Sequence, residues 1–307
     1  LRLKKLSHFD VLVWYSPTIF WGPIIKLLNF FKKSHKYLIL RDIFPKWAID
    51  LEILKKEGIK HKVLRAFENL QYRTADTIAI QTEGNISYFN DIPNTSKKIR
   101  ILKTWYDSSS SEIDLPENIC NKIPKNKKIL LYAGNLGIAQ DQELLLETIK
   151  KMQDQEEFIF LLVGLKDKDK HNVEKYSSMQ GLSNILILDS IDHRYMDALC
   201  RRSYIGIFSL DKRHTTHNIP GKFLQYLSTG LPVFGLCGKG DIVKLISDRG
   251  FGRTYLGNQA DEAVEILKEL FKDIENDRID FESLKDYIDD ELSTKSAVNH
   301  ILKRISE

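Results

Sequence analysis

The chain has 307 residues, 42% of them hydrophobic, and a formal net charge of +4, which suits a globular protein of two ordinary domains. Three widely separated cysteines, Cys120, Cys200 and Cys237, exclude a disulfide framework and favour a reducing compartment. No Cys/His set has zinc spacing and no signal peptide is visible. Because the first residue is Leu1, we expect a fragment or a processed product.

The charge is unevenly distributed along the chain. Residues 1–105 contain 19 Lys/Arg and 9 Asp/Glu, a balance of +10, so the remainder carries −6. A basic first part suits anionic membrane lipid or a phosphate-bearing acceptor, although a solvated basic surface explains it as well. Nucleic acid is not expected as a partner, because the lysines are scattered and no nucleic-acid-binding motif is present.

Residues 9–31 are mostly apolar, which raises the possibility of a transmembrane helix. Ser16-Pro17 and Gly22-Pro23 interrupt this stretch, and the uncharged run 11–25 is short for a membrane span. A strand over 10–15, a loop and a helix from Pro23 are therefore predicted.

A second buried strand, 37–40, continues directly into Arg41 and Asp42. Polar residues after a buried strand lie at its carboxyl end, where open α/β sheets bind ligands. An arginine there can neutralise a phosphate, and an aspartate can orient or deprotonate a hydroxyl. An ion pair that caps the strand would explain the two residues equally well.

The rest of the chain alternates between buried strands and helices. In the first half we predict a helix at 61–75 and strands at 77–80 and 97–102; residues 108–128, with the serine run 108–111, form the linker. In the second half we predict strands at 129–133, 158–163, 185–188, 205–208, 233–234 and near Tyr255, and helices at 142–152, 173–179, 195–202, 222–228, 241–249 and from Asp261. This alternation predicts two doubly wound parallel domains that face each other across a ligand-binding cleft.

The turn Gly134-Asn135-Leu136-Gly137 follows a buried strand and precedes a helix. Glycines there allow a backbone to approach a pyrophosphate closely. The turn is neither the G-x-G-x-x-G fingerprint nor a Walker motif, so by itself it favours a structural turn over a phosphate site.

The stretch 218–235 predicts a loop, a helix, a tight turn and a buried strand. Pro220 suits the first helical turn, Gly230 suits a left-handed position after the helix, and Pro232 prevents the helix from continuing. The free amides around Ile219, Gly221 and Lys222 would form an anion site at the helix N-terminus. A plain helix-turn-strand connection would have much the same sequence.

His214 and His217 have H-x-x-H spacing in a loop rich in hydroxyl groups. A metal would need a third ligand, and none is apparent, so contact with a sugar or phosphate or a solvated loop remains. The motifs of hydrolases and of protein kinases are not present.

The order of four segments resembles the family 4 glycosyltransferases of GT-B fold, in particular the bacterial group that builds O-antigen, capsule or colanic acid. The segments are Arg41-Asp-Ile-Phe-Pro45, Lys103-Thr-Trp-Tyr-Asp107, Leu131-Tyr-Ala-Gly-Asn-Leu-Gly137 with Gln140, and Ile219-Pro-Gly-Lys-Phe-Leu-Gln-Tyr-Leu-Ser-Thr-Gly-Leu-Pro232. The resemblance covers residues 9 to about 305. It implies an acceptor domain at 1–110 that is incomplete at its start, a linker at 111–127, a nucleotide-sugar domain at 128–282, and C-terminal helices at 283–307 that cross back to the first domain.

The resemblance also implies a retaining transferase without a cofactor or catalytic metal, with a nucleotide-sugar donor of UDP type. Its acceptor would be lipid-linked or a glycan, met in the cytoplasm or at the inner face of the membrane. By position, the catalytic residues would be Arg41, Asp42 and Lys222, and the donor-binding residues Gly134, Asn135, Leu136, Gly137, Gln140, Gly164, Ile191, His217, Ile219, Gly221 and Gln225. Phe20, Trp21, Ile24, Ile25, Lys26, Lys32 and Lys33 could face the membrane, although core packing explains the apolar ones equally well.

Several positions depart from the family pattern. The ribose-binding glutamate of the family is Gln225 here, and an earlier acidic position is His217. The basic pair that often follows the glycine turn is Asn135 and Gln140. These departures leave a second hypothesis open, a catalytically impaired nucleotide-sugar-binding subunit of another transferase. A nucleotide-sugar 2-epimerase is a more distant alternative, since its carboxylate and histidine set is not apparent.

Overall fold

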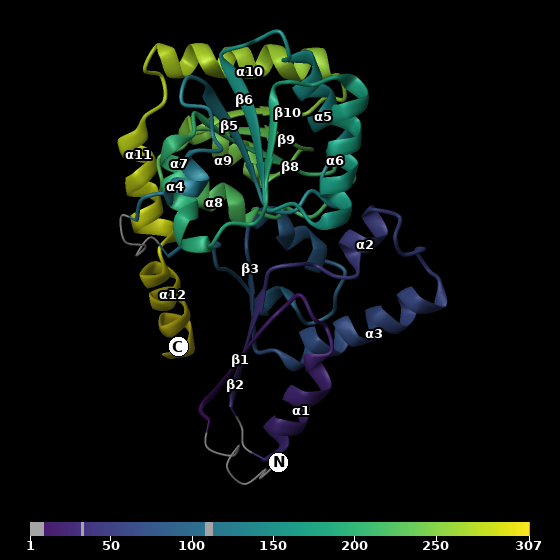
Figure 1. Ribbon diagram of the computed structural model, residues 1–307. Helices are drawn as coiled ribbons and strands as arrows, with labels where there is room; N and C mark the ends of the chain where they lie inside the picture. Colours follow the sequence, from purple (N-terminus) through teal and green to yellow (C-terminus); the bar gives the residue numbers. More distant parts are fainter. Residues whose placement is uncertain (1–8, 32–33, 108–112, 307) are drawn as a thin grey trace. The chain divides into compact units, whose positions relative to one another are not determined.

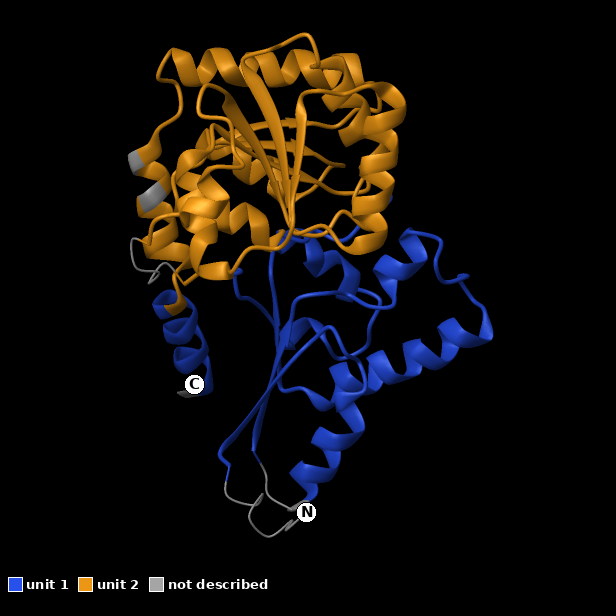
Figure 2. Cartoon of the chain, in the orientation of Figure 1, with its two compact units in different colours: residues 1–104, 213–219, 295–307 blue, residues 105–212, 220–294 orange. Residues whose placement is uncertain are grey.

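The computed structural model describes residues 9–31, 34–107 and 113–306 (Figure 1). The chain divides into two compact units (Figure 2). Unit 1 comprises 1–104, 213–219 and 295–307, and unit 2 comprises 105–212 and 220–294.

This grouping differs from the continuous ranges that the sequence suggested. Residues 213–219 belong to unit 1, although they fall inside the expected nucleotide-sugar domain. Of the expected linker, residues 113–127 belong to unit 2, while the serine run 108–111 lies outside the described residues. Only 295–307 of the expected C-terminal crossing segment belongs to unit 1.

Unit 1 contains a four-stranded parallel sheet in the order β1-β2-β3-β4. Tyr37 of β2 pairs with Val13 of β1 and Thr77 of β3. Most of β2 and all of β3 are buried, as expected for continuous apolar runs in the middle of a parallel sheet. The elements are β1 (Val11–Tyr15), α1 (Trp21–Phe31), β2 (His35–Leu40), α2 (Lys46–Asp50), α3 (Ile59–Thr74), β3 (Thr77–Ile80), η2 (Glu83–Phe89), η3 (Ser96–Lys98), β4 (Ile99–Ile101) and most of α12 (Thr294–Ser306).

Unit 2 contains a six-stranded parallel sheet in the order β10-β9-β8-β5-β6-β7. The elements are α4 (Glu117–Cys120), β5 (Lys128–Ala133), α5 (Gln142–Lys151), β6 (Phe158–Val163), α6 (Asp167–Gln180), β7 (Ile185–Leu188), η4 (His193–Tyr195), α7 (Met196–Arg202), β8 (Ile205–Ser209), α8 (Gly221–Ser228), β9 (Val233–Leu236), α9 (Asp241–Arg249), β10 (Gly252–Tyr255), α10 (Ala260–Glu275), α11 (Phe281–Tyr287) and the π-helical turn η5 (Ile288–Leu292).

The strand order of unit 2 reverses between β5 and β8. From β5 the chain proceeds outward to β7, and it then returns to β8 and proceeds to β10 on the other side. Because such crossovers are right-handed, α5 and α6 cover one face of the sheet and α7 and α8 the other (Figure 1). The carboxyl ends of β5 and β8 therefore border the crevice where sheets of this kind bind ligands.

The structure confirms the predicted α/β class with two parallel sheets. It also confirms the left-handed turn after α8, where Gly230 has φ +73°. α6 begins at Asp167, earlier than the predicted 173, and α2, η2 and α4 were not predicted. Within the described ranges, no helix combines the length and the apolar character that a membrane crossing requires.

Helix α8 lies against the sheet because β8 has a glycine beneath it. A Cβ on Gly206 would lie 2.4 Å from the ring of Tyr226. The Tyr226 hydroxyl accepts a hydrogen bond from the Ala133 amide (2.9 Å), and a second one links it to the Ile207 carbonyl (3.2 Å). One aromatic side chain thus fixes α8 against both strands that border the crevice.

We expect Gly206→Ala to lower the free energy of unfolding by about 1–3 kcal/mol, because the added methyl group overpacks this contact. Chemical denaturation would measure the change. Gly221→Ala is the matched control, since a Cβ at Gly221 meets no heavy atom within 4 Å. Equal stability of the two variants would contradict the role of the Gly206–Tyr226 contact.

Candidate functional site

The crevice of unit 2 begins at the turn after β5. Gly134 has φ +93°, a conformation that favours glycine, and a Cβ placed there would meet no heavy atom within 4 Å. Its amide donates to the Val163 carbonyl (2.8 Å), so the sheet continues to this residue. A ligand can therefore approach the backbone closely at Gly134.

The residues that follow Gly134 have different roles. The side chain of Leu136 is fully buried in the core of unit 2, so only its backbone could contact a ligand. The Asn135 Oδ1 and Gln140 Oε1 atoms are buried and have no hydrogen-bond partner among the described residues. Orphaned buried oxygens are rare in folded proteins, and these two could accept from the hydroxyl groups of a ligand.

Lys222 lies in the first turn of α8, above Tyr132 of β5. Its Nζ is 3.8 Å from the centroid of the Tyr132 ring, a cation–π contact. The residue as a whole is partly exposed, but the Nζ atom is buried and has no hydrogen-bond partner within the described ranges. Burial lowers the pKa of Lys222 to about 7. An ammonium in this environment lacks an anion, and the ends of β5 and α8 leave it beside the crevice.

The start of α8 adds backbone donors to this charge. The first amides of a helix, here those of Gly221 and Lys222, have no partner inside the helix. The amide of Ile219, which was also expected to be free, donates to Gln81 Oε1 (3.0 Å) within unit 1. The anion site predicted at 219–222 is therefore reduced to the two helical amides and the ammonium.

Gln225 lies three residues after Lys222, on the same face of α8, and it contacts a buried carboxylate. Its Nε2 donates to Asp197 Oδ1 (3.3 Å), and the Tyr106 hydroxyl donates to the same oxygen (2.8 Å). Burial raises the pKa of Tyr106, as does the contact with Asp197, while Ser228 and Gln225 lower it. The three side chains thus form a polar cluster that links α7 and α8 to Tyr106.

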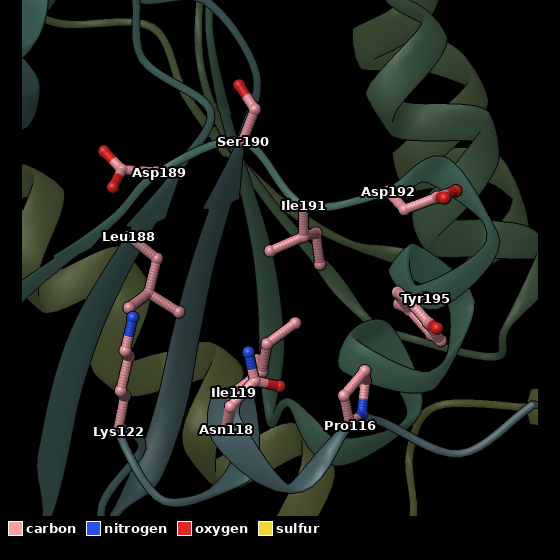
Figure 3. Close-up of a pocket in the computed structure, with 10 residues that line it drawn as sticks. All are labelled: Pro116, Asn118, Ile119, Lys122, Leu188, Asp189, Ser190, Ile191, Asp192 and Tyr195. Atoms are coloured by element: carbon pink, nitrogen blue, oxygen red, sulfur yellow. The ribbon is translucent and has the colours of Figure 1, made fainter.

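A pocket of about 480 Å³ lies next to the end of β7. Figure 3 shows its side chains, which come from α4 on one side and from the loop after β7, including Ile191, on the other. The loop is near the glycine turn, because a Cβ on Gly164 would lie 3.6 Å from Ser190 Oγ and 3.9 Å from the Gly134 Cα. Residues from the turns after β5, β6 and β7 thus come together at one edge of the sheet.

Arg41 and Asp42 lie at the carboxyl end of β2 in unit 1. Their amides both donate to Ser16 Oγ, and the guanidinium of Arg41 donates to Thr104 Oγ1 (2.7 Å). Burial raises the pKa of Asp42, although His214 and Arg41 oppose this shift. Burial also lowers the pKa of Arg41, while the neighbouring Tyr15 and Asp42 raise it. Asp42 is thus a carboxylate with a raised proton affinity, as a general base requires.

The segment 213–219 is hydrogen bonded to the carboxyl end of the unit 1 sheet. The carbonyl of His217 accepts from Thr82 Oγ1 (3.0 Å) and Asn85 Nδ2 (3.1 Å), and its amide donates to Asn85 Oδ1 (2.9 Å). Asn218 Nδ2 donates to Asp42 Oδ1 (3.3 Å). His217 and Ile219 are thus placed with Arg41 and Asp42 in unit 1.

The structure sorts the predicted site residues into two groups. The unit 1 group contains Arg41, Asp42, His217 and Ile219, and the unit 2 group contains Gly134, Asn135, Leu136, Gly137, Gln140, Gly164, Ile191, Gly221, Lys222 and Gln225. Tyr132, Asp197 and Ser190 were not predicted. Tyr106 was not predicted as a site residue either. Both Tyr106 and Tyr132 lie in segments that carried the resemblance, and those motifs were the only sequence signal for them. Throughout the described ranges, no group of three or more His, Cys, Asp or Glu side chains is placed to hold a metal ion.

We expect Lys222→Met to stabilise the unliganded protein at pH 6–7 by about 2 kcal/mol, because it removes a buried ammonium without a counter-ion. The pKa of Lys222 is about 7 in the folded protein and near 10.5, the ordinary value for lysine, in the unfolded chain. Between these two pH values the unfolded chain therefore binds more protons than the folded protein. As pH rises from 7 to 10, the free energy of unfolding of wild type should increase relative to that of Lys222→Met.

Denaturation at several pH values would measure this difference. Lys222→Arg is the matched control, since its cation does not titrate in the range. A stability difference between Lys222→Met and wild type that is constant from pH 6 to 10 would contradict the lowered pKa.

Comparisons with known proteins identify relatives of this chain. Residues 127–273 match the family "Glycosyl transferases group 1". The chain is 22% identical over 236 residues to "Putative colanic acid biosynthesis glycosyl transferase WcaI" of Escherichia coli, covering 72% of this chain and 56% of the relative. It is 21% identical over 241 residues to "Probable glycosyltransferase WbjE" of Pseudomonas aeruginosa, covering 76% and 59%. The chain therefore spans less than two thirds of the length of these relatives.

Solved structures show the same fold. HepE of Anabaena, determined in complex with UDP-glucose, superimposes with a TM-score of 0.76 at 13% identity, covering 99% of this chain and 80% of HepE. At this identity the likeness concerns the fold alone. Two Rossmann-like parallel sheets of the GT-B fold are thus established, and residues 127–273 are similar to the glycosyl transferases group 1 family.

Proposed function

We propose that this protein is a retaining, metal-independent family 4 glycosyltransferase, active without a cofactor. It moves a sugar from a UDP-sugar to a lipid-linked or glycan acceptor during the synthesis of cell-surface polysaccharide. The observation that carries the proposal is the buried ammonium of Lys222, which lies at the start of α8 and has no hydrogen-bond partner in the part of the chain that the structure describes. The group 1 domain and the UDP-glucose bound to HepE support the choice of donor.

The donor would lie along the carboxyl edge of the unit 2 sheet. Lys222 and the amides at the start of α8 bind the diphosphate, and Gln225 meets the ribose. The sugar lies over the glycine turn, where Asn135 and Gln140 have unfilled acceptor oxygens, and the base lies near Ile191. As the glycosidic bond breaks, negative charge accumulates on the diphosphate. A fixed cation and helix-end amides stabilise that charge without reorganisation.

The acceptor would meet unit 1. Asp42, with its raised pKa, orients or deprotonates the acceptor hydroxyl, and Arg41 neutralises a phosphate of a lipid-linked acceptor. Retention of the anomeric configuration follows from the family resemblance alone.

Peripheral contact with the inner face of the membrane, from the cytoplasm, is part of the proposal. α1 exposes Trp21, Ile24, Leu27 and Phe30 as a stripe of residues three apart that winds around the helix, while Ile25 is buried and belongs to the core. Lys32 and Lys33, expected beside this stripe, lie outside the described residues.

We expect calorimetry with a panel of UDP-, GDP- and ADP-sugars to show binding of one nucleotide class, UDP, unchanged by EDTA and lost in Lys222→Met. Because the free protein must protonate Lys222 to bind the diphosphate, affinity should fall as pH rises above 7, by up to about tenfold per pH unit. Lys222→Arg should bind with little pH dependence.

Failure of every nucleotide sugar to bind would overturn the proposal. Binding without donor hydrolysis or transfer would instead favour a nucleotide-sugar-binding subunit that needs a catalytic partner. The observation that favours a binding subunit is the neutral amide of Gln225, which stands where the family has a carboxylate.

We expect Asp42→Asn to reduce the rate of transfer to an acceptor by about 100-fold or more, with donor affinity unchanged. In the wild-type protein the rate should increase with pH through the raised pKa of Asp42, because the base must be deprotonated. Asp91→Asn, at an exposed residue of unit 1, is the control. A parallel loss of donor binding in Asp42→Asn would assign the residue to the donor site instead.

A further inference from the structure

The cluster of Gln225, Asp197 and Tyr106 determines which atom of the Gln225 amide faces the carboxylate. Asp197 is 5% exposed and Gln225 is 9% exposed, so neither contact is exchanged for bulk water. Asp197 Oδ1 accepts two hydrogen bonds, one from Gln225 Nε2 (3.3 Å) and one from the Tyr106 hydroxyl (2.8 Å). An ionised carboxylate can only accept hydrogen bonds, so the amide must direct its NH₂ group toward Asp197.

The opposite atom of the amide then has a fixed direction. Oε1 is bonded to the same carbon as Nε2 and points away from Asp197. Without the carboxylate, the two ends of an amide are nearly equivalent in shape and the group can rotate by half a turn. The contact therefore selects an acceptor, and not a donor, for the side of Gln225 that faces away from Asp197.

The position of Gln225 on α8 indicates which part of a donor would meet this acceptor. Residues three apart on a helix are neighbours on its surface, and Gln225 is three residues after Lys222. In a nucleotide sugar, the group joined to the diphosphate on the nucleoside side is the ribose, which carries two hydroxyl donors.

We propose that Asp197 is a positioning residue that holds the Gln225 amide oxygen toward the ribose hydroxyls of the donor. It does not touch the nucleotide itself, and the inference depends on the donor site proposed above. The arrangement also accounts for an amide at position 225. A glutamate there would bring a second carboxylate to within about 3.3 Å of Asp197, where two like charges are unfavourable.

The test compares UDP with 2′,3′-dideoxy-UDP, which lacks both ribose hydroxyls, by calorimetry on the full chain at pH 7. We expect wild type to prefer UDP by about tenfold, the value of one net hydrogen bond. Asp197→Leu has a similar shape but no acceptor. In this variant the ratio of the affinities for UDP and for 2′,3′-dideoxy-UDP should fall to about one, because UDP binds more weakly while the dideoxy nucleotide binds as before.

Two further variants keep the test decisive. Asp197→Asn combined with Gln225→Glu exchanges the donor and the acceptor, so it should retain the preference for UDP even if Asp197→Leu does not fold. Asp261→Leu removes an exposed carboxylate that pairs with Lys151, and it should behave as wild type.

The outcomes separate the two proposals. If wild type binds neither nucleotide, the donor site and this inference both fail. If wild type prefers UDP and Asp197→Leu either keeps that preference or weakens both nucleotides equally, only the role of Asp197 fails. Loss of the preference in the exchanged double variant would also overturn that role.

Discussion

The ammonium of Lys222 lies 3.8 Å from the centroid of the Tyr132 ring and has no hydrogen-bond partner among the described residues, and holding this cation in place is the constraint on which the candidate site of unit 2 depends. A cation removed from water destabilises the fold unless other contacts hold it in place. Tyr226 supplies such contacts, since its ring packs on Gly206 and its hydroxyl is bound to the backbone of β5 and β8. These contacts hold α8, and with it the Lys222 ammonium, at a place where the charge can stabilise an anion.

Most of the fold was predictable, because a parallel sheet buries its strands on both faces. Runs such as Phe158–Val163 are apolar without interruption and flanked by turn residues, and this pattern predicts a buried strand. The early part of α6 was missed for the converse reason. Its first six residues are all polar, and Val173 is the one residue of this helix that is fully enclosed, so hydrophobic periodicity begins only there. Short helices such as α2 have too few turns to show a period.

The candidate site was predictable only where chemistry follows directly from position in the chain. Asp42 follows a buried strand and Gly221 begins a helix, so the position of each in the chain was enough to predict it as a site residue. Asp197 does not, because its contact with Gln225 joins residues 28 positions apart, and nothing local to either one specifies it. The prediction for the Ile219 amide was wrong for a similar reason, a partner that is distant in the sequence. Its position predicted a free donor, but Gln81, 138 residues away, occupies it.

The segment 213–219 has a consequence for how this protein can vary. It lies within the stretch that matches the glycosyl transferases group 1 family, yet its hydrogen bonds are made to Thr82, Asn85 and Gln81 of unit 1. A chimera that replaced residues 127–273 by those of a relative would also replace this segment, including Thr215 and Asn218, whose side chains are hydrogen bonded to Asp50 and Asp42 of unit 1. The exchangeable module is therefore discontinuous in sequence, and substitutions at Asn218 and Asp42, whose side chains are hydrogen bonded to each other, should be inherited together.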